Sequence, residues 1–368
     1  MTHQKYTASL TTFGGMIPVD NKPSKGDIQT VSGIISPDKL GATMTHEHLL
    51  IDFTCMFSEP EDARFVSLAY QPVDLTNLGW VRYHSYMSRD NLLLDDVETA
   101  IREASFFKHA GGGTIVDVTT YGIGRDPLGL KKISQIAGIN VISGAGFYVN
   151  AVHPENMDQL SESFLAEKIA NEVLVGIDGT DIRAGIIGEI GCTWPLHKNE
   201  RKVLRAAAIA QKETGAPILI HPGRNPKAPI EILNILSQAG ADITHTVMGH
   251  LDRTISEVSD LLEIANSGCY LEYDLFGNET SYYALGDIVM PNDAQRMEYI
   301  SALISNGFGD KIVVSHDICH KHSMSSYGGH GYSHILENIA PRMAQRGFTK
   351  DQINAIIIEN PARLLTFS

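Results

Sequence analysis

Short apolar runs alternate along most of this chain with longer stretches in which apolar residues recur every three or four positions. The first pattern is typical of buried β-strands and the second of amphipathic helices. Strands are predicted at 42–51, 113–119, 141–144, 184–189, 217–221, 245–250, 269–274 and 311–317. The clearest helical patterns cover 96–109, 199–212, 229–238, 254–266 and 293–305.

Several helical patterns end at a glycine, such as Gly111 or Gly215, just before the next strand begins. A glycine can take the left-handed conformation that ends a helix. The repeated order of strand, helix and glycine predicts parallel strands joined by right-handed crossovers. Eight such units indicate an α/β fold, a closed (β/α)8 TIM barrel whose chemistry lies at the C-terminal ends of the strands.

Metal-ligating residue types lie where the predicted strands end. Because alternate residues of a strand point to the same side, His46 and His48 can present two imidazoles to one metal ion while Glu47 faces away. Such a pair also arises by chance in a chain with 15 histidines. Four further residues of these types end later strands: Glu189, His221, His250 and Asp317. A barrel would bring all of them to one mouth, which favours a metal centre over unrelated polar strand ends.

The length of 368 residues, with 43% hydrophobic and 20% charged residues, fits one large domain or two ordinary ones. We expect a polar N-terminal tail at 1–27 and a single hydrolase domain at 28–368. An insert at about 53–92, rich in proline, tyrosine and serine, is too long for an ordinary loop of this fold. It is expected either to cover the mouth or to carry a subunit contact, so a homodimer stays open.

The formal charge of −14, without any stretch rich in lysine or arginine, argues against nucleic acid and anionic membranes as partners. Residues 1–27 lack the apolar core of a secretion signal, and no segment approaches the roughly 20 apolar residues of a membrane span. The four cysteines are widely spaced, which is typical of reduced thiols. We therefore expect a cytosolic protein.

Several segments resemble the phosphotriesterase branch of the amidohydrolase superfamily: MTHEH at 44–48, IVDVTT at 115–120, GEIG at 188–191, IHPGR at 220–224, GHLDR at 249–253 and NPAR at 360–363. Longer strings resemble the animal phosphotriesterase-related proteins more narrowly: GAGFY at 144–148, EIGCTWPL at 189–196, LEYDLFG at 271–277 and YGGHGYSH at 327–334. The resemblance runs from about residue 29 to the C-terminus.

The resemblance implies a binuclear centre of two divalent metal ions per subunit, with zinc favoured and the choice of metal left open. His46, His48 and Asp317 would hold the more buried ion, and His221 and His250 the more exposed one. Glu189 would bridge them, where bacterial phosphotriesterases use a carboxylated lysine. A hydroxide between the ions would attack the acyl carbonyl, and Asp317 would carry the proton to the leaving amine, so Asp317 and Glu189 are the predicted catalytic residues.

The activity implied by the resemblance is that of a hydrolase acting on linear amide C–N bonds. It would cleave N-acetyltaurine to taurine and acetate, a step of taurine metabolism, with weaker action on N-acetyl amino acids. A small anionic N-acyl substrate needs a cationic contact, for which Arg224 is favoured unless it pairs with an acid such as Asp252 or Asp274. The predicted substrate contacts are Arg224, Arg253, Tyr148, Tyr273, Lys321 and His330. Phe147 and Tyr332 are further candidates for the pocket walls.

Other functions stay open beside this one. A lactonase or a phosphoester hydrolase could use the same two metal ions, and a metal-dependent binding protein would need only the ligands. A serine hydrolase is disfavoured because the chain lacks a Gly-x-Ser-x-Gly elbow. His320 and His322 follow the eighth strand, where a third metal or a substrate contact competes with the favoured reading of solvated imidazoles.

Overall fold

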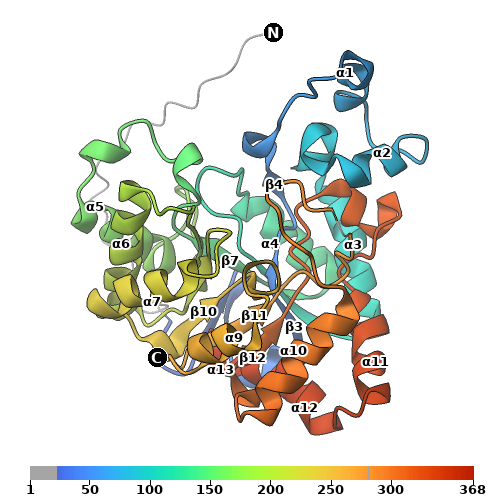
Figure 1. The fold of residues 1–368 in the computed structure, drawn as a ribbon. Helices are drawn as coiled ribbons and strands as arrows, with labels where there is room; N and C mark the ends of the chain where they lie inside the picture. The colour runs from blue at the N-terminus through green and yellow to red at the C-terminus, as the bar shows by residue number, and fades with distance from the viewer. Residues whose placement is uncertain (1–22, 281) are drawn as a thin grey trace.

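The central sheet has eight strands, in the order β12-β11-β10-β9-β8-β7-β6-β3 (Figure 1). The computed structural model describes residues 23–280 and 282–368, so most of the predicted tail at 1–27 lies outside the described residues. Each pair of neighbouring strands is parallel. The strands are β3 (Ala42–Glu47), β6 (Gly112–Asp117), β7 (Asn140–Ala145), β8 (Ile186–Gly191), β9 (Ile218–His221), β10 (Thr246–Met248), β11 (Tyr270–Tyr273) and β12 (Ile312–Val314).

The two ends of this order adjoin, so the sheet wraps into a nearly closed barrel. The backbone N–H of Asp317, just after β12, donates to the carbonyl oxygen of His46 in β3 at 3.1 Å. The N–H of His46 in turn donates to the Oγ of Ser315 at 3.0 Å. The predicted (β/α)8 barrel is confirmed, and the carboxyl ends of all eight strands meet at one mouth.

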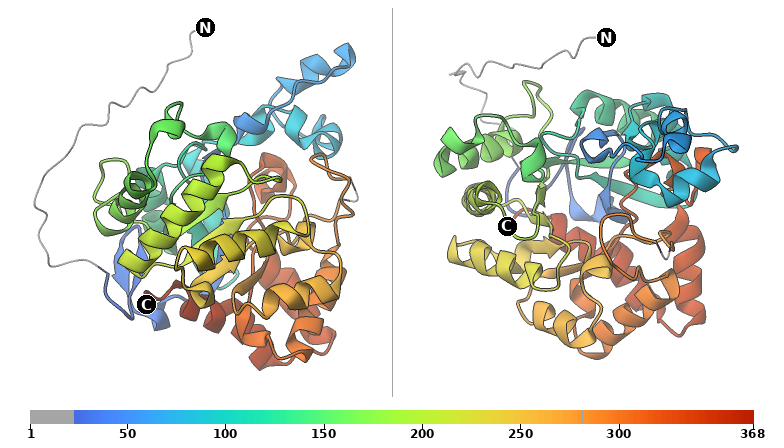
Figure 2. Two further views of the ribbon diagram at one scale, coloured as in Figure 1. Left: turned by 60° about the vertical axis from the view of Figure 1, so that its left-hand side comes forward. Right: turned by 45° about the horizontal axis from the view of Figure 1, so that its top comes forward.

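Helices surround the barrel (Figures 1 and 2). They are α3 (Val97–His109), α4 (Pro127–Ala137), α5 (Glu162–Leu174), α6 (Lys198–Thr214), α7 (Ala228–Gln238), α8 (Leu251–Thr254), α9 (Val258–Ala265), α10 (Asp293–Ser305), α11 (Ala340–Gln345), α12 (Lys350–Asn354) and α13 (Asn360–Leu365). The prediction of a single helix at 254–266 is wrong at its start. Ile255 and Glu257 are extended and separate α8, which ends at Thr254, from α9, which begins at Val258.

The barrel interior is closed by apolar side chains at the end opposite the mouth. β1 (Ile28–Thr30) and β2 (Gly33–Ile35) form a hairpin there, and the N–H of Val31 donates to the carbonyl of Val141 in β7 at 2.9 Å. Ile28 packs in one buried cluster with Leu364 and Leu365 of α13. The inward-facing members of this cluster are Val116, Val118, Ile142, Ile186, Leu219, Val247, Tyr270 and Val313. Polar chemistry is thereby left to the other end.

The insert at about 53–92 folds into short helices that project from the barrel beside the mouth (Figures 1 and 2). It contains α1 (Ala63–Ala69) and α2 (Leu78–Tyr83). β4 (Ile51–Asp52) and β5 (Leu93–Leu94) pair antiparallel at its base.

The predicted strand at 42–51 is too long, because β3 ends at Glu47. The N–H of Leu49 donates to the Asp117 carboxylate at 2.7 Å instead of to a neighbouring strand.

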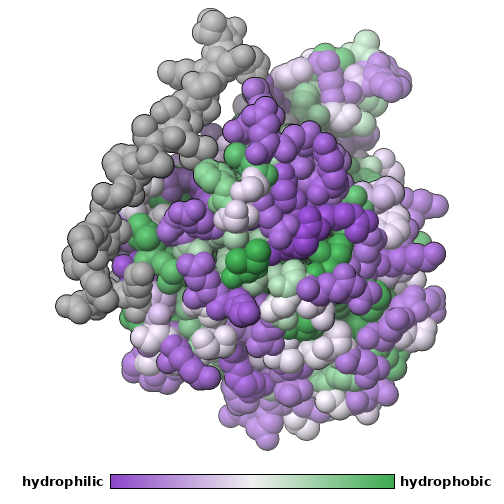
Figure 3. Space-filling view, turned by 90° about the vertical axis from the view of Figure 1, so that its left-hand side faces the viewer, coloured by the Kyte–Doolittle hydropathy of each residue, from purple (hydrophilic) through white to green (hydrophobic). Residues whose placement is uncertain are grey.

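One side of the outer surface is largely hydrophilic (Figure 3). On the side of the barrel that carries α5, α6 and α7, hydrophilic residues form most of the surface and hydrophobic ones lie in small separate groups (Figure 3). Within residues 23–280 and 282–368, no helix combines the length and the apolar character needed to cross a membrane.

Candidate metal centre

The six predicted metal ligands lie together at the mouth of the barrel. Their positions follow the strands: His46 in β3 and His48 just after it, Glu189 in β8, His221 at the end of β9, His250 after β10 and Asp317 after β12. Five of them are buried, whereas the side chain of Asp317 is 15% exposed. Residues far apart in sequence thus converge as the barrel requires.

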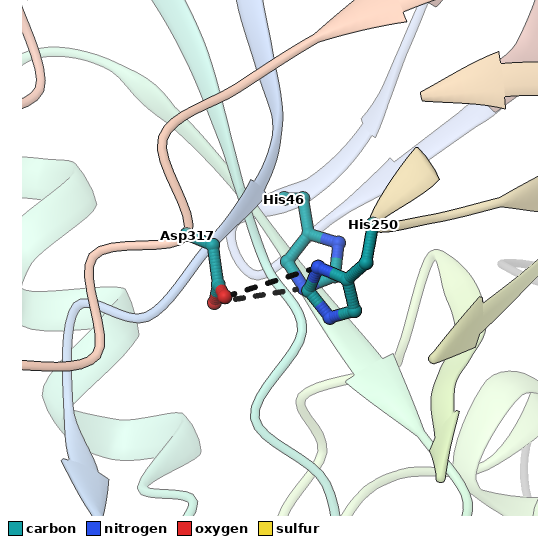
Figure 4. A group of neighbouring side chains, drawn as sticks. All are labelled: His46, His250 and Asp317. Atoms are coloured by element: carbon teal, nitrogen blue, oxygen red, sulfur yellow. Dashed lines mark ion pairs between the residues drawn. The ribbon is translucent and has the colours of Figure 1, made fainter. Parts of the chain in front are cut away.

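Two of these residues have unusual backbone conformations. His250 and Asp317 lie in the left-handed region, with φ of 52° and 50°. Non-glycine residues rarely adopt it, because it costs about 1–3 kcal/mol, and they do so where surrounding contacts hold them. The N–H of His250 donates to Oδ2 of Asp274 at 2.7 Å, and that of Asp317 to His46. Both side chains turn toward His46 as a result (Figure 4).

Glu189 occupies the centre of the cluster. Its Oε2 lies 2.7 Å from Nδ1 of His221, 3.5 Å from Nε2 of His46 and 3.7 Å from Nε2 of His250. Its Oε1 lies 3.4 Å from Nε2 of His48. Burial raises the pKa of this carboxyl, but His221 and the other imidazoles outweigh burial and hold the pKa well below its usual range. Glu189 is therefore an ionised carboxylate surrounded by four nitrogen atoms.

Asp317 faces the same space from the opposite strand end. Its Oδ1 lies 3.3 Å from Nε2 of His48 and 3.8 Å from Nε2 of His46, and its Oδ2 lies 3.9 Å from Nδ1 of His250 (Figure 4). Of the four sets of described residues whose possible ligand atoms lie within 4.8 Å of one another, three consist of these ligands: His46, His250 and Asp317; His46, His48 and Glu189; Glu189, His221 and His250. Two of these sets share Glu189, as a bridging carboxylate requires.

The cluster fits divalent metal ions. Nε2 of His46 is buried and has no hydrogen-bond partner among the described residues. Nε2 of His250 and Nδ1 of His221 face each other at 2.8 Å. A buried nitrogen without a partner, such as Nε2 of His46, is costly, whereas a cation between these nitrogens and the carboxylates would use its lone pair. Imidazole nitrogen with carboxylate oxygen is a donor set that zinc accepts.

Asp274, just after β11, holds two of the imidazoles in place. Its Oδ1 lies 2.8 Å from Nδ1 of His250, and its Oδ2 lies 3.2 Å from Nδ1 of His46. Glu272 adds a contact of 3.0 Å to Nδ1 of His46. Burial raises the pKa of Glu272 to about 7; it also acts on Asp274, but His250 and His46 outweigh it and keep the pKa of Asp274 well below its usual range. These acids direct Nε2 of both imidazoles into the cluster.

Sequence reasoning missed this supporting role of Glu272 and Asp274. The signal was present, since the two acids stand two residues apart at the end of a predicted strand, as His46 and His48 do. On the other side, Nδ1 of His48 lies 2.8 Å from the Oγ1 of Thr119. Partners of this kind fix which ring nitrogen is free for a metal.

Glu47 faces away from the cluster, as its position between two histidines predicts. Its carboxylate accepts hydrogen bonds from the N–H groups of His316 at 2.9 Å and Ile318 at 3.0 Å, and from the Oγ of Ser315 at 2.8 Å. These residues flank Asp317. Glu47 thus fixes the segment that presents Asp317 to the mouth.

A cavity above the cluster is lined by four of the predicted substrate contacts: Arg224, Arg253, Tyr148 and His330. Nε of Arg224 donates to the hydroxyl of Tyr283 at 2.6 Å, and its guanidinium carbon lies 5.6 Å from the centre of that ring. The acid considered as its partner, Asp252, accepts from Arg296 instead, at 2.9 Å. The charge of Arg224 is therefore available to a ligand.

Arg253 and Tyr148 contact the outer nitrogen of His221. Nη2 of Arg253 lies 3.2 Å from Nε2 of His221 and donates to the carbonyl of Pro222 at 3.1 Å. The hydroxyl of Tyr148 lies 3.4 Å from the same Nε2. Burial and the nearby Arg224 lower the pKa of Arg253. These contacts leave Nδ1 of His221 directed at Glu189.

The structure does not bring Tyr273 and Lys321 to this cavity, contrary to expectation. Tyr273 alternates with the two inward-facing acids of its strand, so its buried ring points outward and stacks on Tyr299 with centroids 6.2 Å apart. Nζ of Lys321 pairs with Asp90 of the insert at 2.7 Å. Neither contact was visible in the sequence, because both partners come from distant elements.

Phe147 and Tyr332 are also absent from the cavity lining. Phe147 packs in the core against Tyr121, with ring centroids 5.5 Å apart. The buried hydroxyl of Tyr332 donates to the carbonyl of His48 at 2.7 Å. The residues that line the cavity without having been predicted come from the insert and from the loops after β11 and β12. They include Arg82, Tyr86, Tyr282, Tyr283 and Cys319.

Comparison with known proteins gives a consistent result. The sequence model of the Phosphotriesterase family matches residues 26–365. An N-acetyltaurine hydrolase of Salmo salar is 50% identical over 344 residues, which cover 93% of this chain and 98% of that protein. The Homo sapiens N-acetyltaurine hydrolase is 48% identical with the same coverage. The solved structure of a resiniferatoxin-binding protein from Rhodobacter sphaeroides has a TM-score of 0.90 and 35% identity, covering 94% of this chain and 96% of that one.

Proposed function

This chain belongs to the phosphotriesterase family, and from that membership we propose that it hydrolyses the amide bond of N-acetyltaurine to give taurine and acetate. One observation carries the proposal: a cluster able to hold divalent metal ions shares its cavity with the cation of Arg224. A small anionic amide needs both, one for the carbonyl and one for the sulfonate. N-Acetyl amino acids, which carry a carboxylate instead, would be weaker substrates.

We propose that two divalent ions, with zinc favoured, bind in this cluster. When bound, such ions activate water and polarise a carbonyl as Lewis acids. The proposed ligands of one ion are His46, His48 and Asp317, and those of the other are His221 and His250, with Glu189 between them. Asp274 and Thr119 contact Nδ1 of His250 and Nδ1 of His48, respectively. These contacts would hold the other ring nitrogen of each imidazole toward the ions.

Asp317 is the proposed proton carrier. Its carboxylate lines the cavity and is the more exposed of the two in the cluster, at 15% against 3% for Glu189, and its loop is fixed by Glu47. An amide needs such a group, because an amine leaves poorly until its nitrogen is protonated. In our proposal an oxygen of Asp317 takes the proton of the attacking water and gives it to that nitrogen.

Arg224 is the proposed contact for the sulfonate. Its Nε is engaged with Tyr283, which holds the guanidinium in place and leaves its two Nη groups for substrate oxygens. A planar pair of donors suits an oxyanion with several oxygens. Arg253 adds a second positive charge in the same cavity wall.

The proposal is tested by incubating the purified, zinc-loaded protein with N-acetyltaurine and following the reaction by proton NMR. Taurine and acetate should appear in equal amounts. N-Ethylacetamide, which has the same acyl group but no sulfonate, should be cleaved at least about tenfold more slowly, because charged hydrogen bonds to the anion are lost. Absence of taurine release would contradict the proposal, and equal rates would remove the role of the anion.

A further inference from the structure

One side of the cavity is a wall of four aromatic rings: Phe53, Tyr86, Tyr148 and His320. The Phe53 ring is central, with centroids 6.2 Å from Tyr86, 6.1 Å from Tyr148 and 6.0 Å from His320. The Tyr86 and His320 rings meet edge to face at 5.1 Å. These residues, called here the aromatic wall, come from the start and end of the insert and from the loops after β7 and β12.

The aromatic wall is held in place by the fold around it. Phe53 is only 5% exposed and directly follows β4, and its N–H donates to the carbonyl of Leu92 at 2.8 Å. Nδ1 of His320 lies 3.2 Å from the Sγ of Cys319. His320 is therefore packed between rings, not solvated as the sequence suggested. A fixed ring beside the cluster sets how much space a bound group finds there.

The central ring of the wall and Arg224 lie on opposite sides of the mouth. Phe53 follows the segment after β3, and His320 follows β12, the strand that adjoins β3. Arg224 follows β9, which stands four places from β3 in the sheet order. In a barrel of eight strands, four places is the opposite side. A substrate that spans the mouth would touch Arg224 at one end and Phe53 at the other.

The two sides also differ in charge. Burial keeps the pKa of His320 well below its usual range and raises the pKa of Tyr86 well above its own, so neither ring is charged near neutral pH. Arg82 of the insert also lines the cavity, but it is exposed to solvent and donates to the carbonyl of Gly328 at 2.7 Å. An anionic group is favoured at Arg224, and an apolar group is favoured at the wall.

We propose that Phe53, Tyr86 and His320 form the acyl subsite of this hydrolase, and that the Phe53 ring restricts it to short acyl groups such as acetyl. The inference rests on the proposed function and deepens it, since it assigns the orientation of the substrate and the residue that selects acyl length. The carbonyl would lie over the metal ligands, with its methyl group against Phe53 and the sulfonate toward Arg224.

The test compares kcat/KM for N-acetyl-, N-propionyl-, N-butyryl- and N-hexanoyltaurine in the zinc-loaded wild type, Phe53→Ala and Phe53→Leu. The wild type should lose about tenfold or more from acetyl to butyryl, because added methylenes find no room. Phe53→Ala should raise the butyryl-to-acetyl ratio by about tenfold or more, and Phe53→Leu by less. Phe57→Leu is the matched control: its ring packs on Tyr70 at 5.7 Å, away from the cavity lining, and its ratio should equal that of the wild type.

The outcomes separate the acyl subsite from the proposed function. Wild-type cleavage of N-hexanoyltaurine as fast as N-acetyltaurine would overturn the subsite without any variant. So would a ratio within about twofold of the wild type in a Phe53 variant that circular dichroism and thermal melting show to be folded. Cleavage of none of the four amides would instead refute the proposed function, and the subsite with it.

Discussion

Asp317 differs from the other five proposed ligands because its carboxylate is partly exposed to the cavity. It lies close to three imidazoles, yet none of them makes a short contact with it comparable to that between His221 and Glu189. A carboxylate placed in this way can exchange protons with a substrate while the more buried groups hold the geometry. The protonation step of the proposed mechanism is therefore assigned to Asp317.

Replacing Asp317 with Asn should lower kcat for N-acetyltaurine by about 10²- to 10⁴-fold, the usual contribution of a positioned acid or base. The amide keeps the shape and one oxygen ligand but cannot accept the proton. Metal content, measured by mass spectrometry of the desalted protein, should stay near that of the wild type, because five proposed ligands remain. Full activity in this variant would contradict the role of Asp317.

Replacing Arg224 with Gln should raise KM for N-acetyltaurine about 10- to 100-fold, because charged hydrogen bonds worth about 1.5–3 kcal/mol are lost. The sulfonate is remote from the reacting bond, so kcat should change only a few-fold. Steady-state kinetics with N-ethylacetamide provide the control, since this amide has no anion to lose. An equal effect on both substrates would mean that Arg224 supports the fold or the metal ligands instead.

At the scale of single residues, the sequence was sufficient for side chains whose positions depend on one strand. His46 and His48 share a side by the two-residue period, and the barrel then places Glu189 and His221 nearby. The same two-residue period explains why Tyr273 does not line the cavity: the acids on either side of it, Glu272 and Asp274, take the inward positions. Lys321 does not line the cavity because it pairs with Asp90 of the insert, and no local sequence pattern reveals such a pair.

Among the elements, α10 is tied to the mouth through a buried ion-pair network. Nε of Arg296 lies 2.9 Å from Oδ2 of Asp252, two residues after a proposed metal ligand, and its Nη1 lies 2.8 Å from Oδ1 of Asp293. The side chains of all three are at least 97% buried, so each charge depends on the others. The network fixes α10 against the segment that carries His250.

Replacing Arg296 with Met should lower the free energy of unfolding by about 3–5 kcal/mol, because buried Asp252 loses its cation and Asp293 is left with its ion-pair contact to His334. Urea denaturation followed by circular dichroism measures the change. Arg346→Met is the matched control: Arg346 pairs with Glu298 at 3.5 Å on the surface, where a pair contributes about 1 kcal/mol or less. Similar losses in both variants would contradict the structural role of the buried network.

The strands of the barrel were predictable because strands buried on both faces form continuous apolar runs. The ends of the strands were not predictable. His48, His250 and Asp317 belong to the predicted strands, but they lie one to three residues past the observed ends of β3, β10 and β12. The insert could not be placed either, since its short helices bury little apolar surface of their own. Its contribution to the cavity, including Phe53 and Tyr86, follows from tertiary contacts alone.

For the whole molecule, the barrel converts six positions spread from His46 to Asp317 into one cluster, and the proposed metal ions would link the strands that carry them. Only the folded barrel brings these ligands together. The folded state should therefore bind the ions far more tightly than the unfolded chain does. Ion binding is then also a contribution to the stability of the folded barrel.

Removal of metal with a chelator should lower the midpoint of thermal unfolding by at least about 5 °C, since a ligand at 1,000 times its Kd stabilises by about 4 kcal/mol. Scanning calorimetry before and after readdition of zinc measures the effect, and recovery of the midpoint shows that it is reversible. Glu189→Ala should start from a lower midpoint and respond less. An unchanged midpoint in the wild type would contradict a metal centre that joins the strands.

The central claim is that this barrel is an amidase for a small anionic amide, and not a lactonase or a phosphoester hydrolase built on the same cluster. The most direct measurement is kcat/KM of the zinc-loaded protein for N-acetyltaurine, an N-acetyl amino acid, an acyl lactone and a phosphotriester. N-Acetyltaurine should have the highest value, and the N-acetyl amino acid a lower one. A higher value for the lactone or the phosphotriester would contradict it.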